Sequence, residues 1–412
     1  LLLSSLEQGL EPVLNLSYSK HLLDNAPNTS FLCHHAKHAI FQGEKEPLYL
    51  DTNTLKLQVV MTSPTISSED TLLAQQSLYV LFNERLSQSV SQARYPWRRE
   101  FLKQLASSWQ WPQHVSQILD QRQDSSYRQC LSEFQQVSKL HLIVRDSLNK
   151  FAKKHLLKLE HQNQQLNQKY QLFHDVAPDT IPYLPSALLP KNTEQDLYLH
   201  RFNSDGNWFI SDIPLESEKE QPLFKASSLL NVITWAVRNH ILTQANRLKV
   251  ADNTEQVTAS LVLKLVQQLL RSPLSEQVPL ISEALLNEAE QLEQVMLFVN
   301  LENEGPQNKL SQQGLVVSSL QNDPLNYALK KQNLVFTIEG LIYSSWGQWH
   351  YFSHSGNTAT LDMMCTLLLW QPRKTSIELT KCWCPSEAHG KSIEMRLSRL
   401  YSDVTAHYKS NK

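Results

Sequence analysis

The spacing of hydrophobic residues changes along this chain, and the change coincides with a proline-rich segment. Over residues 67–175 the apolar positions recur at the interval of an α-helix, whereas from residue 196 onwards many of them alternate with polar positions. Residues 176–195 contain four prolines, which end helices and stiffen connections. We therefore predict a helical domain over residues 67–175, a linker over 176–195 and a domain of strands and helices over 196–412, preceded by a mixed segment over 1–66.

Four helices are expected in the helical domain. Ser67 followed by acidic residues is typical of a helix N-terminus, and Pro112 suits the first turn of another helix. Before this domain we expect a short helix that ends at Gly43 and then an extended or irregular stretch over residues 46–65. The four helices are expected over residues 67–90, 98–109, 109–121 and 125–173, the last with a break.

The second half of the chain is expected to pair its strands into hairpins. Residues 196–203 and 207–214 flank a Ser-Asp-Gly turn, and residues 334–344 and 349–356 flank a Trp-Gly-Gln turn. Neighbouring hairpins favour a mostly antiparallel sheet covered by helices, which together with the helical half predicts an α+β fold. Further helices are expected over residues 227–250, 258–272, 357–370 and 391–410, and further strands over 293–303 and 376–384.

Composition argues against several classes of protein. The chain has 412 residues but only 9 glycines, and it contains neither GxGxxG nor GxxxxGK[ST], so we expect no glycine-rich phosphate loop. Its net charge of −2 argues against a nucleic-acid partner. The five scattered cysteines suit a reducing compartment, and no signal peptide or apolar run of about 20 residues is visible. We therefore expect a cytoplasmic protein without a membrane span, and the leucine at position 1 suggests a fragment.

Two groups of residues carry side chains that could bind a metal. His34 and His38 lie four residues apart, a spacing that metal-binding pairs use, with Cys33 and His35 beside them. No glutamate completes a HExxH motif and no second ligand cluster is visible, so we interpret these residues as a polar helix face. The two cysteines that flank Trp383 also lack further ligands and are interpreted as buried thiols. No metal site is therefore expected in this chain.

The segment RYPWRR, residues 94–99, is the best candidate for a contact with an acidic group. It places Arg94, Arg98 and Arg99 around Trp97 at the start of an expected helix. Arginine near a helix N-terminus is electrostatically unfavourable, which points to an acidic partner, and guanidinium groups beside an aromatic ring can bind a phosphate or stack. The alternative is a helix start with solvated arginines. The chain contains no DxD pair and no GxSxG motif, so residue spacing reveals no active site.

Six short segments, in order along the chain, resemble the bacterial class I adenylate cyclases of the enterobacterial type. The resemblance extends over roughly residues 40–400. Because the six segments occur in the same order, together they are more specific than any single segment. The segments are residues 77–112, 206–214, 232–248, 295–303, 341–356 with the helix that follows, and 376–384. They include Trp97, Trp208, Trp235 and Trp346, which we take as structural landmarks.

This resemblance implies a parent enzyme that converts ATP to cyclic AMP and pyrophosphate with Mg²⁺. The catalytic domain of that family is N-terminal and carries a Gly-Ser turn followed by Asp-x-Asp, and neither element is present in this sequence. The chain is therefore expected to be the central and regulatory region, without the catalytic domain, without catalytic residues and without a cofactor of its own. Residues 1–66 are expected to join the missing catalytic domain.

The resemblance also implies partners. One is the enzyme's own catalytic domain, which Arg94, Arg98 and Arg99 are candidates to contact. The other is the glucose-specific phosphocarrier of the sugar phosphotransferase system. The alternative is a stand-alone signalling module without catalytic activity.

The Trp-Gly-Gln-Trp turn at residues 346–349 is interpreted as a structural element. Large aromatic residues beside a turn fix the register of a strand pair, and Gly347 can supply a positive φ. We therefore expect the substitution Trp346→Ala to lower stability more than it changes any ligand affinity.

Overall fold

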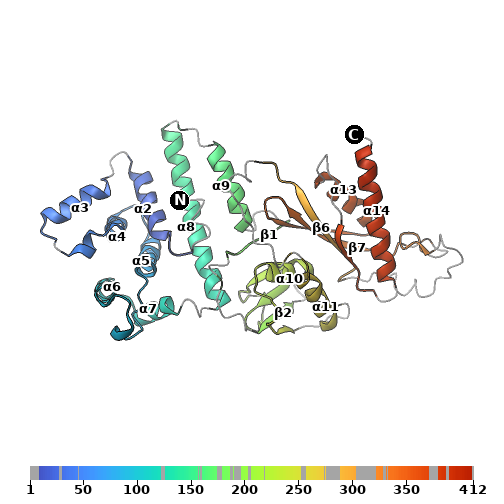
Figure 1. Cartoon of the computed structure of the whole chain (residues 1–412), viewed down its shortest axis with the longest axis horizontal. Coiled ribbons are helices and arrows are strands. Elements are labelled where there is room, and N and C mark those ends of the chain that lie inside the picture. The colour runs from blue at the N-terminus through green and yellow to red at the C-terminus, as the bar shows by residue number, and fades with distance from the viewer. Residues whose placement is uncertain are drawn as a thin grey trace. The chain divides into compact units, whose positions relative to one another are not determined.

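The computed structural model of the chain divides into two compact units (Figure 1). Unit 1 comprises Leu1–Asn167 and Leu184–Thr193, and unit 2 comprises Gln168–Tyr183 and Glu194–Lys412. The linker predicted over residues 176–195 lies largely outside the described residues. The structure describes residues 9–26, 30–44, 46–121, 126–155, 157, 160–173, 179–185, 189, 196–202, 206–217, 219–251, 257–272, 274, 288–302, 322–327, 331, 333–370, 379–386 and 389–410.

Unit 1 is built from helices, as the first half of the sequence predicted. Its helices are α2 (Val13–Asn25), α3 (Leu32–Phe41), α4 (Thr52–Thr62), α5 (Ser68–Phe82), α6 (Pro96–Ser108), α7 (Gln113–Asp120) and α8 (Tyr127–Lys154), with short 3-10 helices η1 (Pro47–Leu50) and η2 (Val90–Gln92). Helix α9 (Glu160–Phe173) begins in unit 1, and its residues from Gln168 onwards belong to unit 2. Helix α2 packs against α4, α5 and α8, and buried side chains such as Leu14, Val60 and Leu78 form the core between them. The break predicted in the long fourth helix falls between α8 and α9.

The stretch predicted to be extended or irregular, residues 46–65, is instead mostly helical. It forms η1 and α4, and the carboxylate of Asp51 caps α4 by accepting a hydrogen bond from the main-chain N–H of Asn53 at 2.9 Å. Leu55, Leu57 and Val59 are separated by polar residues, which is the spacing expected of a strand. In the structure all three are buried in helix α4. Helix α4 has neighbours on several sides, namely α2, α3 and α5, so it buries more than one face and shows no single apolar stripe.

Unit 2 contains two β-sheets flanked by helices. Its strands are β1 (Thr180–Ile181), β2 (Leu197–Arg201), β3 (Trp208–Ser211), β4 (Phe224–Ala226), β5 (Leu248–Val250), β6 (Leu292–Val299), β7 (Thr337–Ser344), β8 (Trp349–Ser355) and β9 (Leu379–Trp383), and its helices are α10 (Leu229–Arg238), α11 (Ala259–Leu270), α13 (Ala359–Trp370) and α14 (Gly390–Ser410). The five-stranded sheet has the order β1-β8-β7-β6-β9 and the four-stranded sheet the order β4-β3-β2-β5. The α+β class is therefore confirmed, with two sheets where one was predicted.

Each sheet is mixed, because one strand in each pairs in parallel. Both predicted hairpins form, since β2 pairs with β3 and β7 pairs with β8 in antiparallel register. Strand β9 pairs in parallel with β6, and β5 pairs in parallel with β2. None of the helices that the structure describes is both long and apolar enough to cross a membrane.

The helix predicted over residues 227–250 ends much earlier than expected. Helix α10 stops at Arg238, Asn239 occupies its C-cap position, and His240 adopts a left-handed φ of 53°. The chain then continues to β5, which lies beside β2. A left-handed residue cannot continue an α-helix, so the main chain leaves the helical path at His240.

The central strands of the five-stranded sheet, β6 and β7, are largely buried on both faces. On one face Val295, Leu297, Ile338 and Ile342 pack in a common core with side chains of α13 and α14, the two helices beside this sheet in Figure 1. On the other face the alternate residue Glu339 contacts the start of α10 through a hydrogen bond from the N-cap residue. Helix α10 also packs against β3 and β4 of the four-stranded sheet, so it contacts both sheets of unit 2.

Gly340 of β7 holds an aromatic ring directly against the sheet. It pairs with Phe352 of β8, and a Cβ atom placed on Gly340 would lie 2.0 Å from the ring of Phe352. The glycine therefore leaves the space that the ring occupies. In the turn that joins these strands, Gly347 has a φ of 76°, the positive value expected from the sequence.

Candidate functional site

The arginines of residues 94–99 do not share one environment. Arg99 is only 9% exposed, and its guanidinium group donates hydrogen bonds to the main-chain carbonyls of Arg85, Leu86 and Gln88 at 3.3, 2.9 and 2.7 Å. These bonds hold the loop that precedes α6. Arg99 is therefore a structural residue of unit 1, because its guanidinium group is engaged by main-chain carbonyls of the same chain.

Arg94 and Arg98 reach the surface and lie over aromatic rings. The Cζ atom of Arg98 is 5.1 Å from the ring centre of Tyr95 and 5.3 Å from that of Trp97, and Arg94 lies 5.5 Å from Tyr95. Neither arginine makes an ion pair with a described residue. The carboxylate of Glu84, which lies before α6, is buried and accepts the main-chain N–H of Tyr95 at 2.8 Å. The positive charges of the two arginines are therefore left available to a partner.

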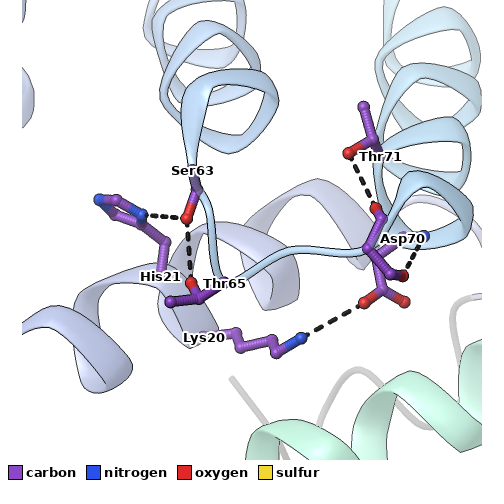
Figure 2. Close-up of polar contacts among 7 residues, drawn as sticks. Lys20, His21, Ser63, Thr65, Asp70 and Thr71 are labelled. Carbon is purple, nitrogen blue, oxygen red and sulfur yellow. Dashed lines mark hydrogen bonds and ion pairs between the residues drawn. The ribbon is translucent and has the colours of Figure 1, made fainter.

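A polar cluster joins α2 to the segment between α4 and α5 (Figure 2). Lys20 and Asp70 form a buried ion pair at 3.3 Å, and Nδ1 of His21 lies 2.8 Å from Oγ of Ser63. Burial lowers the pKa of His21, with a further decrease from nearby histidine charge. A serine beside a histidine can act as a nucleophile with its base, but Ser63 is only 8% exposed and its Oγ lies 2.9 Å from the hydroxyl of Thr65. We therefore interpret the cluster as a structural joint.

A larger group of buried and half-buried charges surrounds α10 in unit 2. At its N-terminus, Glu302 accepts hydrogen bonds from the main-chain N–H of Leu229 at 2.6 Å and from the indole of Trp208 at 2.9 Å. The guanidinium of Arg201 lies 3.4 Å from the same carboxylate. A carboxylate is favoured at this position because the first N–H groups of a helix are unpaired and its dipole is positive there. Glu302 thus connects α10 to β2, β3 and the end of β6.

Glu339 approaches the same helix end from β7. It is 7% exposed, and its Oε1 accepts hydrogen bonds from the hydroxyls of Ser228, the N-cap residue of α10, and of Tyr351. Burial raises the pKa of Glu339 to about 7, the two hydroxyls oppose this increase, and the charge of Glu302 adds to it. Burial and the neighbouring Glu339 also raise the pKa of Tyr351. Glu339 can therefore gain or lose a proton near neutral pH while it is buried at the start of α10.

Arg238 occupies the opposite end of α10. It is 1% exposed, and it donates to the main-chain carbonyls of Ile181 at 2.5 Å and of Gly347 at 2.9 Å while lying 5.6 Å from the ring centre of Tyr183. Burial lowers its pKa to about 10, and the neighbouring tyrosines, Tyr343 first, oppose that change. The helix end thereby holds both β1 and the Trp-Gly-Gln-Trp turn, because their carbonyls bind one guanidinium.

Helix α10 thus has acidic side chains at its N-terminus and a basic side chain at its C-terminus. Both placements are favoured by the helix dipole. This arrangement, called here the α10 joint and made of Arg201, Glu302, Glu339 and Arg238, ties the two sheets of unit 2 together. Each of these charged groups is engaged by another group of the chain, so the joint is suited to positioning α10, and the raised pKa of Glu339 allows proton uptake there.

Sequence reasoning did not identify the α10 joint. Its members are far apart in the chain, and none belongs to a local motif. The available signals were single charges in apolar surroundings, namely Glu339 in the strand sequence TIEGLIYS and Arg238 after the helix sequence LLNVITWAV. A buried charge requires a partner, so each of these residues predicts a contact without predicting which one.

The four tryptophans taken as landmarks have different surroundings. Trp208 and Trp235 are buried in unit 2, while the indole of Trp346 donates to the main-chain carbonyl of Glu288 at 3.1 Å. Trp97 is 55% exposed beside the surface arginines. Three of the four therefore contribute to packing in unit 2, and Trp97 lies on the surface of unit 1.

The possible metal ligands do not form a site within the described part of the chain, where no three His, Cys, Asp or Glu side chains gather around one point. Cys33 lies exposed on α3 with His34 and His38. Cys382 lies in β9, where burial raises its pKa to about 12 and the charge of Glu394 adds to the increase. Such a thiol stays protonated at neutral pH and is a poor metal ligand.

Comparison with known proteins places the chain beside one group of enzymes. Residues 7–184 match the family model for the second domain of class-I adenylate cyclase, and residues 281–411 match the model for its fourth domain. The chain is 25% identical to an adenylate cyclase of Yersinia intermedia over 92% of its own length and 45% of that protein. It is 22% identical to an adenylate cyclase of Proteus mirabilis and 23% identical to one of Escherichia coli K12, in both cases over 83% of the chain and 41% of the relative. The chain thus spans less than half of these relatives, and no solved structure matches it significantly.

Proposed function

Because the chain belongs to the class-I adenylate cyclase family, we propose that it forms the non-catalytic, supporting and regulatory part of an enzyme that makes cyclic AMP and pyrophosphate from ATP. The observation that carries the proposal is the identity and order of the matched domains. The second-domain match covers unit 1 almost entirely, and the fourth-domain match covers the five-stranded sheet from β6 onwards with α13 and α14. Residues 185–280, between the two matches, include α10 and the four-stranded sheet.

The catalytic step is proposed to take place on another domain of the same enzyme. Attack of the 3′-hydroxyl on the α-phosphate requires the charge of the triphosphate to be neutralised, which the family's Mg²⁺ supplies when bound. The described residues do not fit that ion, because they offer no cluster of three possible ligands and the carboxylates of Glu302 and Glu339 are engaged at α10. No catalytic step is therefore assigned to a residue of this chain.

A supporting role is consistent with the α10 joint. The joint connects residues outside both matched domains, such as Arg238 and Ser228, to residues inside the fourth-domain match, such as Gly347 and Glu339. If the four-stranded sheet is displaced, the contacts of the α10 joint must therefore either break or move the five-stranded sheet with it. We propose that this coupling lets unit 2 respond as one body to a regulator.

The proposed partners follow from the family. They are the enzyme's own N-terminal catalytic domain and, for regulation, the glucose-specific phosphocarrier of the sugar phosphotransferase system. The proposed location is the cytoplasm, where ATP and that phosphocarrier are found.

The direct test compares two purified proteins in the same assay. The intact enzyme and the 412-residue chain are each incubated with ATP and Mg²⁺, and cyclic AMP is measured. We expect cyclic AMP from the intact enzyme and none from the chain. Cyclic AMP from the chain alone would show that it is catalytic, and an inactive intact enzyme would refute the cyclase assignment.

The regulatory part of the proposal needs a separate measurement. The intact enzyme is assayed with the phosphocarrier in its phosphorylated and unphosphorylated forms, and the expected result is a rate that differs between the two. Equal rates at saturating phosphocarrier would contradict this partner while leaving the cyclase assignment intact.

A further inference from the structure

We infer that a surface of arginines and aromatic rings at the start of α6 docks a carboxylate-rich surface of another protein. This surface, called the arginine–aromatic patch, consists of Arg94, Tyr95, Trp97 and Arg98. It belongs to unit 1 alone. The inference goes beyond the proposed cyclase function and does not depend on it.

The patch carries positive charge that the described part of the chain does not neutralise. Arg94 is exposed, Arg98 is half-buried against aromatic rings, and neither makes an ion pair with a described residue. Tyr95 and Trp97 are 39% and 55% exposed, so large apolar surfaces adjoin the charges. A free surface of this kind has unmet electrostatic and hydrophobic interactions that a partner can satisfy.

The main chain beneath the patch is held in place by buried polar groups. Arg99 binds three carbonyls of the preceding loop, and Glu84 accepts the main-chain N–H of Tyr95. The carboxylate of Asp120 accepts the main-chain N–H of Ser87 at 2.6 Å in the same loop. The patch is therefore prepared before a partner arrives, which lowers the entropy lost on binding.

The chemistry of the patch fits protein carboxylates. Guanidinium groups form paired hydrogen bonds with carboxylates, and stacking on Tyr95 and Trp97 orients the guanidinium of Arg98 while its charge stays accessible. Arginine, tryptophan and tyrosine are also the residues that contribute most binding energy at protein interfaces. A nucleic-acid partner is disfavoured because two arginines without an ion pair, on a chain of net charge −2, give a weak field.

The test uses the full chain and a fluorescein-labelled peptide in which glutamates are interspersed with leucine and serine. Fluorescence anisotropy measures its dissociation constant for the wild type, for the double variant Arg94→Gln/Arg98→Gln and for Trp97→Ala. The matched control is Arg399→Gln, which removes an equally positive side chain that is 80% exposed on α14. We expect salt-sensitive binding that weakens about tenfold or more in both patch variants and stays unchanged in the control.

Several outcomes would overturn the inference. One is no binding of the peptide to the wild-type chain, and another is equal affinity for the double variant and the wild type. Equal binding of a peptide with glutamines in place of glutamates would remove the role of the carboxylates. Displacement of the peptide by inorganic phosphate, ATP or an oligonucleotide at lower concentration than by unlabelled peptide would assign the patch to a phosphate ligand. Melting curves by circular dichroism establish that each variant is folded.

Discussion

Replacement of Glu339 by glutamine is expected to change how the stability of unit 2 depends on pH. Glu339 is buried in β7 and accepts hydrogen bonds from Ser228 and Tyr351 on the same oxygen, Oε1. Glutamine has an oxygen at that position and no charge at any pH. The variant therefore keeps both hydrogen bonds and resembles the protonated form of the wild-type side chain.

The sign and size of the effect follow from the two pKa values of this carboxyl group. The value is about 7 in the folded chain and 4.5 in an ordinary environment, so the folded chain binds the proton more tightly. Stability is greatest below the lower value, decreases as the pH rises between the two and levels off above the upper one. The difference corresponds to about 3 kcal/mol, of which about 2–3 kcal/mol is lost between about pH 5 and about pH 8.

The assay is urea denaturation followed by tryptophan fluorescence at both pH values. The quantity compared is the free energy of unfolding of Glu339→Gln minus that of the wild type, because other titrating groups then cancel. We expect this difference to become more favourable to the variant by about 2–3 kcal/mol on going from about pH 5 to about pH 8. The matched control is Glu293→Gln, the same chemical change at an exposed position of β6 in the same sheet.

Parallel pH profiles for the wild type and Glu339→Gln would refute the reasoning. They would mean that the carboxyl group has the same proton affinity in the folded and unfolded chain, and hence that it is not buried against α10 as described. A pH-dependent difference of similar size in Glu293→Gln would show that the effect is not specific to the buried site.

Three further predictions test the packing around the five-stranded sheet. Arg238→Met should destabilise the chain by about 1–3 kcal/mol for each of the two main-chain carbonyls it leaves unpaired, and an unchanged urea midpoint would contradict this. Gly340→Ala should destabilise the chain by about 1–3 kcal/mol because the new methyl group overlaps the ring of Phe352. Adding the substitution Phe352→Leu should recover part of this loss. A double variant that is no more stable than Gly340→Ala alone would count against the clash. Trp349→Ala should cost about 3–5 kcal/mol and Trp346→Ala distinctly less, because Trp349 is fully buried and Trp346 is not; equal melting temperatures for the two variants would contradict this.

Much of the fold could be predicted because its signals are local. The cap at Ser67, the alternation in β7 and β8 and the amphipathic α11 each depend on neighbours within a few residues. The errors at α4 and at the end of α10 arise where contacts with the rest of the fold outweigh the local signal. In α4 the burial of several faces hides the helical period, whereas the cap at Asp51 was the signal to weigh more heavily. After Arg238 the chain turns through a left-handed His240, a conformation that histidine adopts only when the surroundings favour it.

The candidate sites show the limit of the same reasoning. The sequence placed Arg94, Arg98 and Arg99 together, but it could not show that Arg99 is used internally, because its acceptors are carbonyls that every residue possesses. The α10 joint was not predictable in any detail. Its contacts form between residues such as Ser228 and Glu339, which only the folded arrangement of two sheets brings together.

The α10 joint has a consequence for how the protein is made. The helix leaves the ribosome well before its charged neighbours, since Glu302 follows Leu229 by 73 residues and Glu339 follows Ser228 by 111. Until β7 has been synthesised, the N-terminus of α10 lacks the acceptors that satisfy it, and Arg238 lacks the carbonyl of Gly347, which comes 109 residues later. Helix α10 therefore cannot complete its contacts in the order of synthesis and must wait for the rest of unit 2. Nascent chains halted before β7 should consequently be the most vulnerable to proteolysis and the most dependent on chaperones.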